Sequence, residues 1–87
     1  KTSKISVEDQ VSIYPNPSYG EFTISLQGQD KINSVEIYDI AGQLIKSYIH
    51  QDSKQVSIIL EGLRNGIYFT KITTDTNQLT KKFVIAK

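Results

Sequence analysis

The stretch VSIYPNPSYGEFTISL, residues 11–26, holds two β-type patterns that are separated by two prolines and a glycine. In its second half, Phe22, Ile24 and Leu26 alternate with polar residues. Successive side chains of a strand point to opposite faces of a sheet, so these three residues form one apolar stripe that another sheet must cover. The segment therefore predicts a fold of two packed layers of strands.

The prolines separate the two patterns. Pro15 and Pro17 have no amide hydrogen to donate to a sheet, and each pushes the residue before it, Tyr14 or Asn16, towards extended geometry. Gly20 then allows the backbone to turn before the next strand begins. We predict a stiff connection that ends the first strand and carries the chain to the other sheet.

The same alternation recurs along the chain. Val35 and Ile37 form a second stripe, and Val56, Ile58 and Leu60 form a third, whereas a helical spacing is nowhere sustained. Candidate strands cover about 11–14, 21–26, 33–39, 43–50, 54–60, 67–74 and 78–86. The pattern predicts an all-β fold, an immunoglobulin-like two-sheet antiparallel β-sandwich of about seven strands.

Glycine and asparagine mark the turns between these strands. Residues 39–42, which end in a glycine, and the dipeptide Asn65-Gly66 each predict a tight hairpin, because these residue types tolerate left-handed geometry. TTDTNQ, residues 73–78, predicts a looser hairpin before the last strand. Tyr68 is predicted to form a tyrosine corner, in which the phenol hydroxyl bonds back to the backbone just upstream.

Composition limits the size and the partners of the domain. The chain has 87 residues, of which 38% are hydrophobic, so it has room for one core, which we place within residues 11–87. Residues 1–10, KTSKISVEDQ, have the composition of a linker, and we expect a longer parent protein. A net charge of +1 does not favour nucleic acid as a partner, although residues 71–87 alone carry +3.

Residues that carry chemistry are few. Ser47, His50 and Asp52 lie close in sequence, but side chains along one strand do not converge as a catalytic triad requires. One histidine and no cysteine leave zinc without ligands. Asp75 and Asn77 are types that bind calcium, but they are also ordinary turn formers, which we favour. We therefore predict no enzyme, no cofactor and no metal.

The tyrosines leave a carbohydrate-binding alternative open. Tyr14, Tyr38 and Tyr68 follow β-branched residues in VSIY, VEIY and NGIY, where an aromatic ring normally packs in the core or on a sheet face. Tyr19 and Tyr48 are less constrained. A carbohydrate-binding module would need an exposed aromatic platform, and we name these two residues as its candidates. A passive spacer or adhesive repeat of a surface protein is a further alternative, and it predicts that the domain can also lie in the middle of a longer chain.

The C-terminal stretch LTKKFVIAK has two interpretations. Phe83, Val84 and Ile85 are consecutive apolar residues, as in a strand that is buried on both faces. Alternatively, a terminal strand with basic ends is presented to a receptor, by strand addition at a sheet edge, and the same edge allows self-association. The candidate recognition residues are Lys81, Lys82, Phe83, Val84, Ile85 and Lys87.

Four segments in this order, VSIYPNPSYGEFTI, VEIYDIAGQLI, LEGLRNGIYF and KKFVIAK, resemble the type A C-terminal sorting domain of the type IX secretion system of Bacteroidota. The resemblance covers about residues 11–87. The family motif falls on Tyr14, Pro15, Asn16, Pro17 and Gly20, on Tyr38, Asp39 and Gly42, on Leu63, Gly66 and Tyr68, and on Lys82, Phe83, Val84, Ile85 and Lys87.

The resemblance implies a small β-sandwich that directs an upstream cargo domain of the same chain out of a Gram-negative cell. The cargo would cross the periplasm and the outer membrane and end as a secreted or cell-surface protein. The implied partners are an outer-membrane shuttle protein and a sortase-like cysteine protease that removes the domain. On this interpretation the segment around Asn16 is architecture, and the last strand is the signal.

Overall fold

The computed structural model of the chain describes residues 11–16, 19–49 and 51–87. These residues form strands and no helix, so they include no helix that is long and apolar enough to cross a membrane. The strands are β1 (Val11–Tyr14), β2 (Glu21–Leu26), β3 (Ile32–Tyr38), β4 (Leu44–Tyr48), β5 (Gln55–Ile59), β6 (Gly66–Thr74) and β7 (Gln78–Ile85). Every predicted strand is present, with ends that differ from the prediction by at most two residues.

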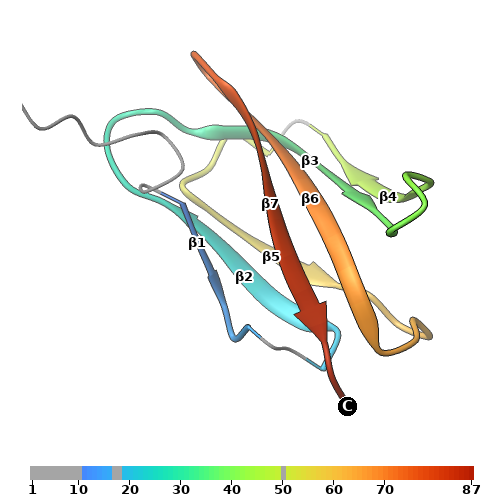
Figure 1. The fold of residues 1–87 in the computed structure, drawn as a ribbon. Helices are drawn as coiled ribbons and strands as arrows, with labels where there is room; N and C mark the ends of the chain where they lie inside the picture. Colours follow the sequence, from blue (N-terminus) through green and yellow to red (C-terminus); the bar gives the residue numbers. More distant parts are fainter. Residues whose placement is uncertain (1–10, 17–18, 50) are drawn as a thin grey trace, which may run out of the picture.

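The strands form two antiparallel sheets, as predicted for an immunoglobulin-like sandwich. One sheet has the order β1-β2-β5 and the other the order β4-β3-β6-β7. Figure 1 shows β1 and β4 at opposite sides of the molecule, with the chain ending just beyond β7. In the larger sheet, β7 pairs with β6 along its whole length, from Gln78 opposite Thr73 to Ile85 opposite Gly66.

The connection after β1 does not change sheets, so that prediction was wrong. β1 and β2 pair directly, with Val11 opposite Leu26 and Tyr14 opposite Thr23. Because Pro15 comes after the last paired residue, its missing amide hydrogen removes nothing from the ladder, and the chain can turn back along the same sheet. Pro17 lies outside the described residues.

Gly20 ends this connection and ties it to Leu60, the residue directly after β5. Its φ is +112°, and its carbonyl accepts the Leu60 amide at 2.7 Å. A Cβ atom at this position would lie 2.6 Å from the Leu60 carbonyl oxygen. The position therefore needs glycine both for its backbone geometry and for the close approach of another backbone segment.

Two of the three predicted hairpins are confirmed. In the β3–β4 turn, the Asp39 carboxylate accepts the amides of Ala41 at 3.0 Å and Gln43 at 2.9 Å. In the β6–β7 turn, the Thr74 amide donates to the Asn77 carbonyl at 2.8 Å. Local turn chemistry was sufficient to predict both.

The third hairpin, at Asn65 and Gly66, was predicted wrongly. β5 and β6 belong to different sheets, so these residues end a crossover between the layers. The predicted tyrosine corner closes this crossover, because the Tyr68 hydroxyl donates to the Arg64 carbonyl at 2.7 Å. The segment thus uses a side-chain hydrogen bond where a hairpin would use a strand ladder.

The inward-facing stripes of both sheets make one core. Phe83 of β7 lies at its centre, with ring centroids 4.6 Å from Phe22 and 5.7 Å from Tyr68. The buried apolar side chains are Val11, Phe22, Ile24, Leu26, Ile32, Val35, Ile37, Val56, Ile58, Leu60, Tyr68, Ile72, Leu79, Phe83 and Ile85. The last strand is therefore part of the core that holds the two sheets together.

Candidate functional site: the C-terminal strand

The side chains of β7 divide between two faces. Phe83 and Ile85 are each 1% exposed and face the other sheet, whereas Lys82 is exposed and Val84 is half-buried on the outer face. The consecutive apolar residues thus do not form a strand buried on both faces. In the folded domain a partner can reach the side chains of Lys82 and Val84, but not those of Phe83 and Ile85.

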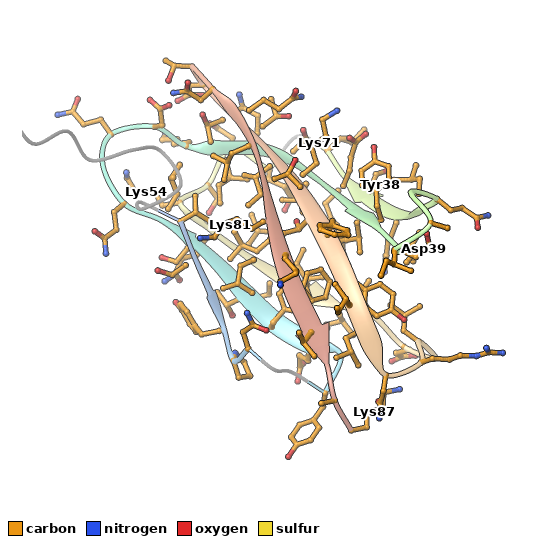
Figure 2. All side chains as sticks on the ribbon, viewed as in Figure 1. Tyr38, Asp39, Lys54, Lys71, Lys81 and Lys87 are labelled. Atoms are coloured by element: carbon orange, nitrogen blue, oxygen red, sulfur yellow. The ribbon has the colours of Figure 1, made fainter. Side chains whose placement is uncertain are left out.

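The adjacent lysines Lys81 and Lys82 also have different surroundings. Lys81 pairs with Thr70, which is completely buried, so its side chain starts on the inner face and is half-buried. Lys82 pairs with Phe69 on the outer face. Figure 2 shows Lys81 midway along β7 and Lys87 at its far end. Lys82 is therefore the exposed charge of the strand interior.

Asn16, between the two prolines, caps β7. Its side-chain oxygen accepts the Val84 amide at 3.1 Å, a contact between residues 68 positions apart. β7 is an edge strand of its sheet, so an amide that points away from β6 has no ladder partner, and at Val84 the Asn16 side chain supplies one. The sequence predicted that the segment around Asn16 is architecture and that the last strand is the signal. The structure places the two in direct contact.

The end of β7 is fixed to the tyrosine-corner loop. The Lys87 amide donates to the Asn65 side-chain oxygen at 3.0 Å, and the Lys87 ammonium donates to the Leu63 carbonyl at 2.8 Å. Two family-motif positions, Lys87 and Leu63, are joined by the second of these bonds. Lys87 therefore anchors the strand, unlike Lys82, which has no partner of this kind among the described residues.

The start of β7 is held by Asp30, in the loop between β2 and β3. The hydroxyls of Thr76 and Thr74 both donate to one Asp30 carboxylate oxygen, the latter at 3.1 Å. These bonds, led by that from Thr76, hold the pKa of the Asp30 carboxyl below its ordinary value, and the charge of Lys54 adds to the effect. The Lys54 ammonium itself donates to the Gly28 and Asp30 carbonyls.

Cross-strand pairing places Ser47, Glu36, Lys71 and Thr80 in one row across the outer face of the larger sheet. Beside this row, the Tyr38 hydroxyl donates to Glu36 at 3.0 Å, which raises the pKa of the phenol. Tyr38, Asp39 and Lys71 are labelled in Figure 2. The row links the two edges of the sheet, because Ser47 lies on β4 and Thr80 on β7.

The tyrosines have three different surroundings. Tyr68 is in the core, as predicted, and Tyr38 is half-buried on a sheet face. Tyr14 is 46% exposed and is not in the core. Tyr19 is 77% exposed, and it lines a shallow depression together with Tyr14. Tyr48 packs against the core, so Tyr14 replaces it as a partner for Tyr19 in any aromatic platform.

The described residues contain no group of three or more histidine, aspartate or glutamate side chains that could hold a metal ion. His50 lies outside the described residues. Asp75 acts in the β6–β7 turn, where its carboxylate accepts the Lys31 amide at 3.1 Å. Asp75 thus serves as a structural acceptor in the turn that it was predicted to form.

A family model for a secretion system C-terminal sorting domain matches residues 12–86. The chain belongs to this family. The sorting domain directs proteins to secretion or to the cell surface, and the family is not catalytic. The match runs from β1 to just beyond β7, so the cap at Asn16 and the anchored end of the last strand both lie within it.

Two curated proteins resemble the sorting domain. A beta-agarase A of Zobellia galactanivorans is 29% identical over 79 residues, which cover 86% of this chain and 14% of that protein. An ulvan lyase of Nonlabens ulvanivorans is 31% identical over 88 residues, which cover 91% of this chain and 15% of that protein. The chain thus spans about a seventh of the length of the relatives that it matches.

Sequence reasoning missed Thr80, which lies on the outer face of β7 two residues before Lys82. Alternation contains the signal that could have found it, because residues 80, 82 and 84 direct their backbone groups to the same side of an extended strand. Alternation identifies the outward residues only when the strand is known to lie at the edge of a sheet. The strand order β4-β3-β6-β7 supplies this information.

Proposed function

We propose that residues 11–87 are the C-terminal sorting domain of a larger secreted protein, with residues 1–10 as the linker from its upstream cargo. The cargo passes through the type IX system of a Gram-negative bacterium. An outer-membrane shuttle protein binds the domain, and a sortase-like cysteine protease removes it. The domain itself catalyses no reaction. The family match over residues 12–86 carries this proposal.

Within the domain, we assign recognition to the outer side of β7. Lys82 is exposed there, whereas Phe83 and Ile85 are held in the core and Lys87 is bonded to the Leu63 carbonyl. The buried residues and Lys87 act indirectly by fixing the strand. Exposed charges contribute little to stability, so Lys82 can be replaced without unfolding the domain.

The test is export of a fluorescent protein fused upstream of residues 1–87, in a host with an intact type IX system. We expect the wild-type fusion to leave the cell and Lys82→Ala to remain largely in the periplasm. Lys71→Ala, on the neighbouring strand β6, is the matched control and is expected to be exported. Thermal melting of each domain checks that it is folded. Equal export of both alanine variants would remove Lys82 from the recognition site.

A second candidate function is carbohydrate binding, which the exposed rings of Tyr14 and Tyr19 favour. Their depression is also lined by Thr23 and Ser57, whose hydroxyls can hydrogen-bond a sugar. The two relatives are named for agar and ulvan, so these polysaccharides are the probes. Affinity electrophoresis of the purified domain in each gel would support this function if retardation disappeared in Tyr19→Ala. An unretarded wild-type domain would exclude binding of these two polysaccharides.

A further inference from the structure

The backbone of β7 has an outer edge that can be assigned residue by residue. The Val84 amide bonds to Asn16, so it points away from β6. In an antiparallel strand, the amide and carbonyl of one residue point to the same side, and the side alternates along the chain. Lys82 and Thr80 therefore also direct both groups outwards. We call the outward backbone groups of Thr80, Lys82 and Val84 the β7 edge.

The start of the strand agrees with this assignment. The Thr74 amide of β6 donates to the carbonyl of Asn77, the residue directly before β7, so residues with odd numbers face β6. Neither Thr80 nor Lys82 has a partner for its outward groups among the described residues, and both residues are exposed. Two consecutive outward positions of the last strand are thus open for pairing, beside a third that Asn16 caps.

The surrounding contacts keep this edge extended. The strand is fixed at its start by the turn that Asp30 holds, along its inner face by the buried ring of Phe83, and at its end by the bonds of Lys87. An incoming strand would therefore meet a template that is already ordered. Pre-ordering lowers the entropic cost of association.

We infer that an extended, acidic segment of a receptor protein pairs with the β7 edge and takes the place of Asn16 at Val84. This inference rests on the sorting function proposed above. Backbone pairing supplies the contact, and the exposed ammonium of Lys82 selects carboxylates in the added strand. Asn16 is a cap that the receptor replaces: a carbonyl of the added strand accepts the Val84 amide instead of the asparagine side chain.

Proline substitution tests the pairing without removing a ladder bond. Because the Thr80 amide points outwards, Thr80→Pro leaves the β6–β7 ladder intact, but it removes a donor from the edge and places a ring there. The matched control is Ser47→Pro. Ser47 is exposed at the other end of the same cross-strand row, and alternation across the row turns its amide away from β3.

In the export assay, we expect Thr80→Pro to lower the exported fraction by about tenfold or more and Ser47→Pro to leave it near the wild-type level. Wild-type export of a folded Thr80→Pro domain would overturn the inference. If Thr80→Pro lowers the melting temperature, export of Lys82→Glu is the deciding measurement, because this substitution leaves every backbone amide of the edge intact. A loss of export in Lys82→Glu that exceeds the loss in Lys71→Glu supports the pairing, and equal export overturns it. Retention of the wild-type fusion would overturn the sorting function itself, and the inference with it.

Discussion

On the side of the sandwich where β4 meets β5, side chains of one sheet bond to the edge of the other, whereas on the β7 side a loop residue caps the Val84 amide. The Tyr48 hydroxyl donates to the Ile59 carbonyl at 3.3 Å and accepts the Ile59 amide at 3.4 Å. The Lys46 ammonium also donates to that carbonyl, at 3.4 Å. The β4/β5 side is thus bridged between the two sheets.

Further along the β4/β5 side, the backbone itself makes the bridge. Ile32 and Ser53 exchange two backbone hydrogen bonds, of 2.7 and 3.2 Å. The pairing of β3 with β4 also shifts register between Ile37 and Tyr38, an irregularity that discourages addition of a further strand. Thr80 and Lys82 on β7 have no comparable partner among the described residues.

The β4/β5 side and the β7 edge therefore differ in how firmly their backbone groups are held. Freeing the β5 edge would require a core-packed ring, Tyr48, to move, and would break the contact between the sheets. Freeing Val84 requires only an exposed asparagine side chain to rotate away. The sorting function proposed above needs both a stable fold and a surface for a receptor, and we assign the first to the β4/β5 side and the second to the β7 edge.

The largest expected effect is on stability, at the glycine that positions the loop of Asn16. Gly20→Ala places a Cβ 2.6 Å from the Leu60 carbonyl at a φ of +112°, so we expect it to cost about 3 kcal/mol or more. Gly42→Ala is the control: its φ is also positive, at +86°, but no atom lies within 4 Å of the new Cβ. It should cost about 1 kcal/mol. Urea unfolding measures both, and equal costs would contradict the close approach at Leu60.

The β4/β5 bridge is tested next. Tyr48→Phe keeps the ring but removes both hydrogen bonds to Ile59, so we expect a loss of about 1 to 2 kcal/mol of unfolding free energy. Tyr38→Phe removes a hydroxyl that bonds only on the outer face of its sheet, to Glu36, and should cost less. Chemical denaturation of the two variants compares them. A Tyr48→Phe domain as stable as the wild type would mean that the hydroxyl does not close this side.

The Asn16 side chain should contribute little to the unfolding free energy, but it should protect the Val84 amide from hydrogen exchange. Asn16→Ala removes an exposed hydrogen bond and should cost below about 1 kcal/mol. Hydrogen exchange at the Val84 amide should accelerate, whereas exchange at Phe83, whose amide faces β6, should change only with global stability. The acceleration at Val84 is the specific result. Equal changes at both amides would contradict the cap.

The smallest expected effect is the pH dependence of the turn that starts β7. The folded-state pKa of Asp30 is lowered, so its contribution to stability is complete above the ordinary aspartate pKa and is lost as pH falls through the folded value. Asp30→Asn should therefore show a smaller decrease in unfolding free energy than the wild type between neutral and acidic pH. Thr76→Val removes the hydrogen bond that lowers the Asp30 pKa most, so it should also make the decrease in unfolding free energy at acidic pH smaller. Denaturant titrations at several pH values measure these slopes, and identical wild-type and Asp30→Asn slopes would contradict the shift.

Local patterns predicted the parts of the fold that depend on neighbouring residues. Alternation placed the strands, since each apolar stripe has to be buried, and the residue types at Asp39 and Asp75 predicted their turns. Tyr68 was predictable because its partner Arg64 is only four residues away. The pairing of strands was harder, because the same alternation suits either sheet. Both errors, after β1 and at Asn65, concern which strands are neighbours.

The candidate site could be predicted only in part for the same reason. Lys82 and Val84 were among the expected recognition residues, but the burial of Phe83 beside them depends on the opposing sheet. The contact of Asn16 with Val84 joins the two ends of the domain, and no local pattern encodes it. The role of Lys87 was equally hidden, since a terminal lysine has the same appearance in sequence whether it is exposed to a receptor or bonded to a loop.

Photo-crosslinking distinguishes the two edges of the larger sheet, because it reports which of them the secretion machinery touches. A photoreactive amino acid is placed at Thr80 or at Ser47, the two ends of one cross-strand row, in the exported fusion. If a receptor strand pairs with the β7 edge, position 80 crosslinks to a component of the secretion machinery and position 47 gives no crosslink above background. Crosslinks of equal yield from both positions, or a crosslink from position 47 alone, would contradict this pairing.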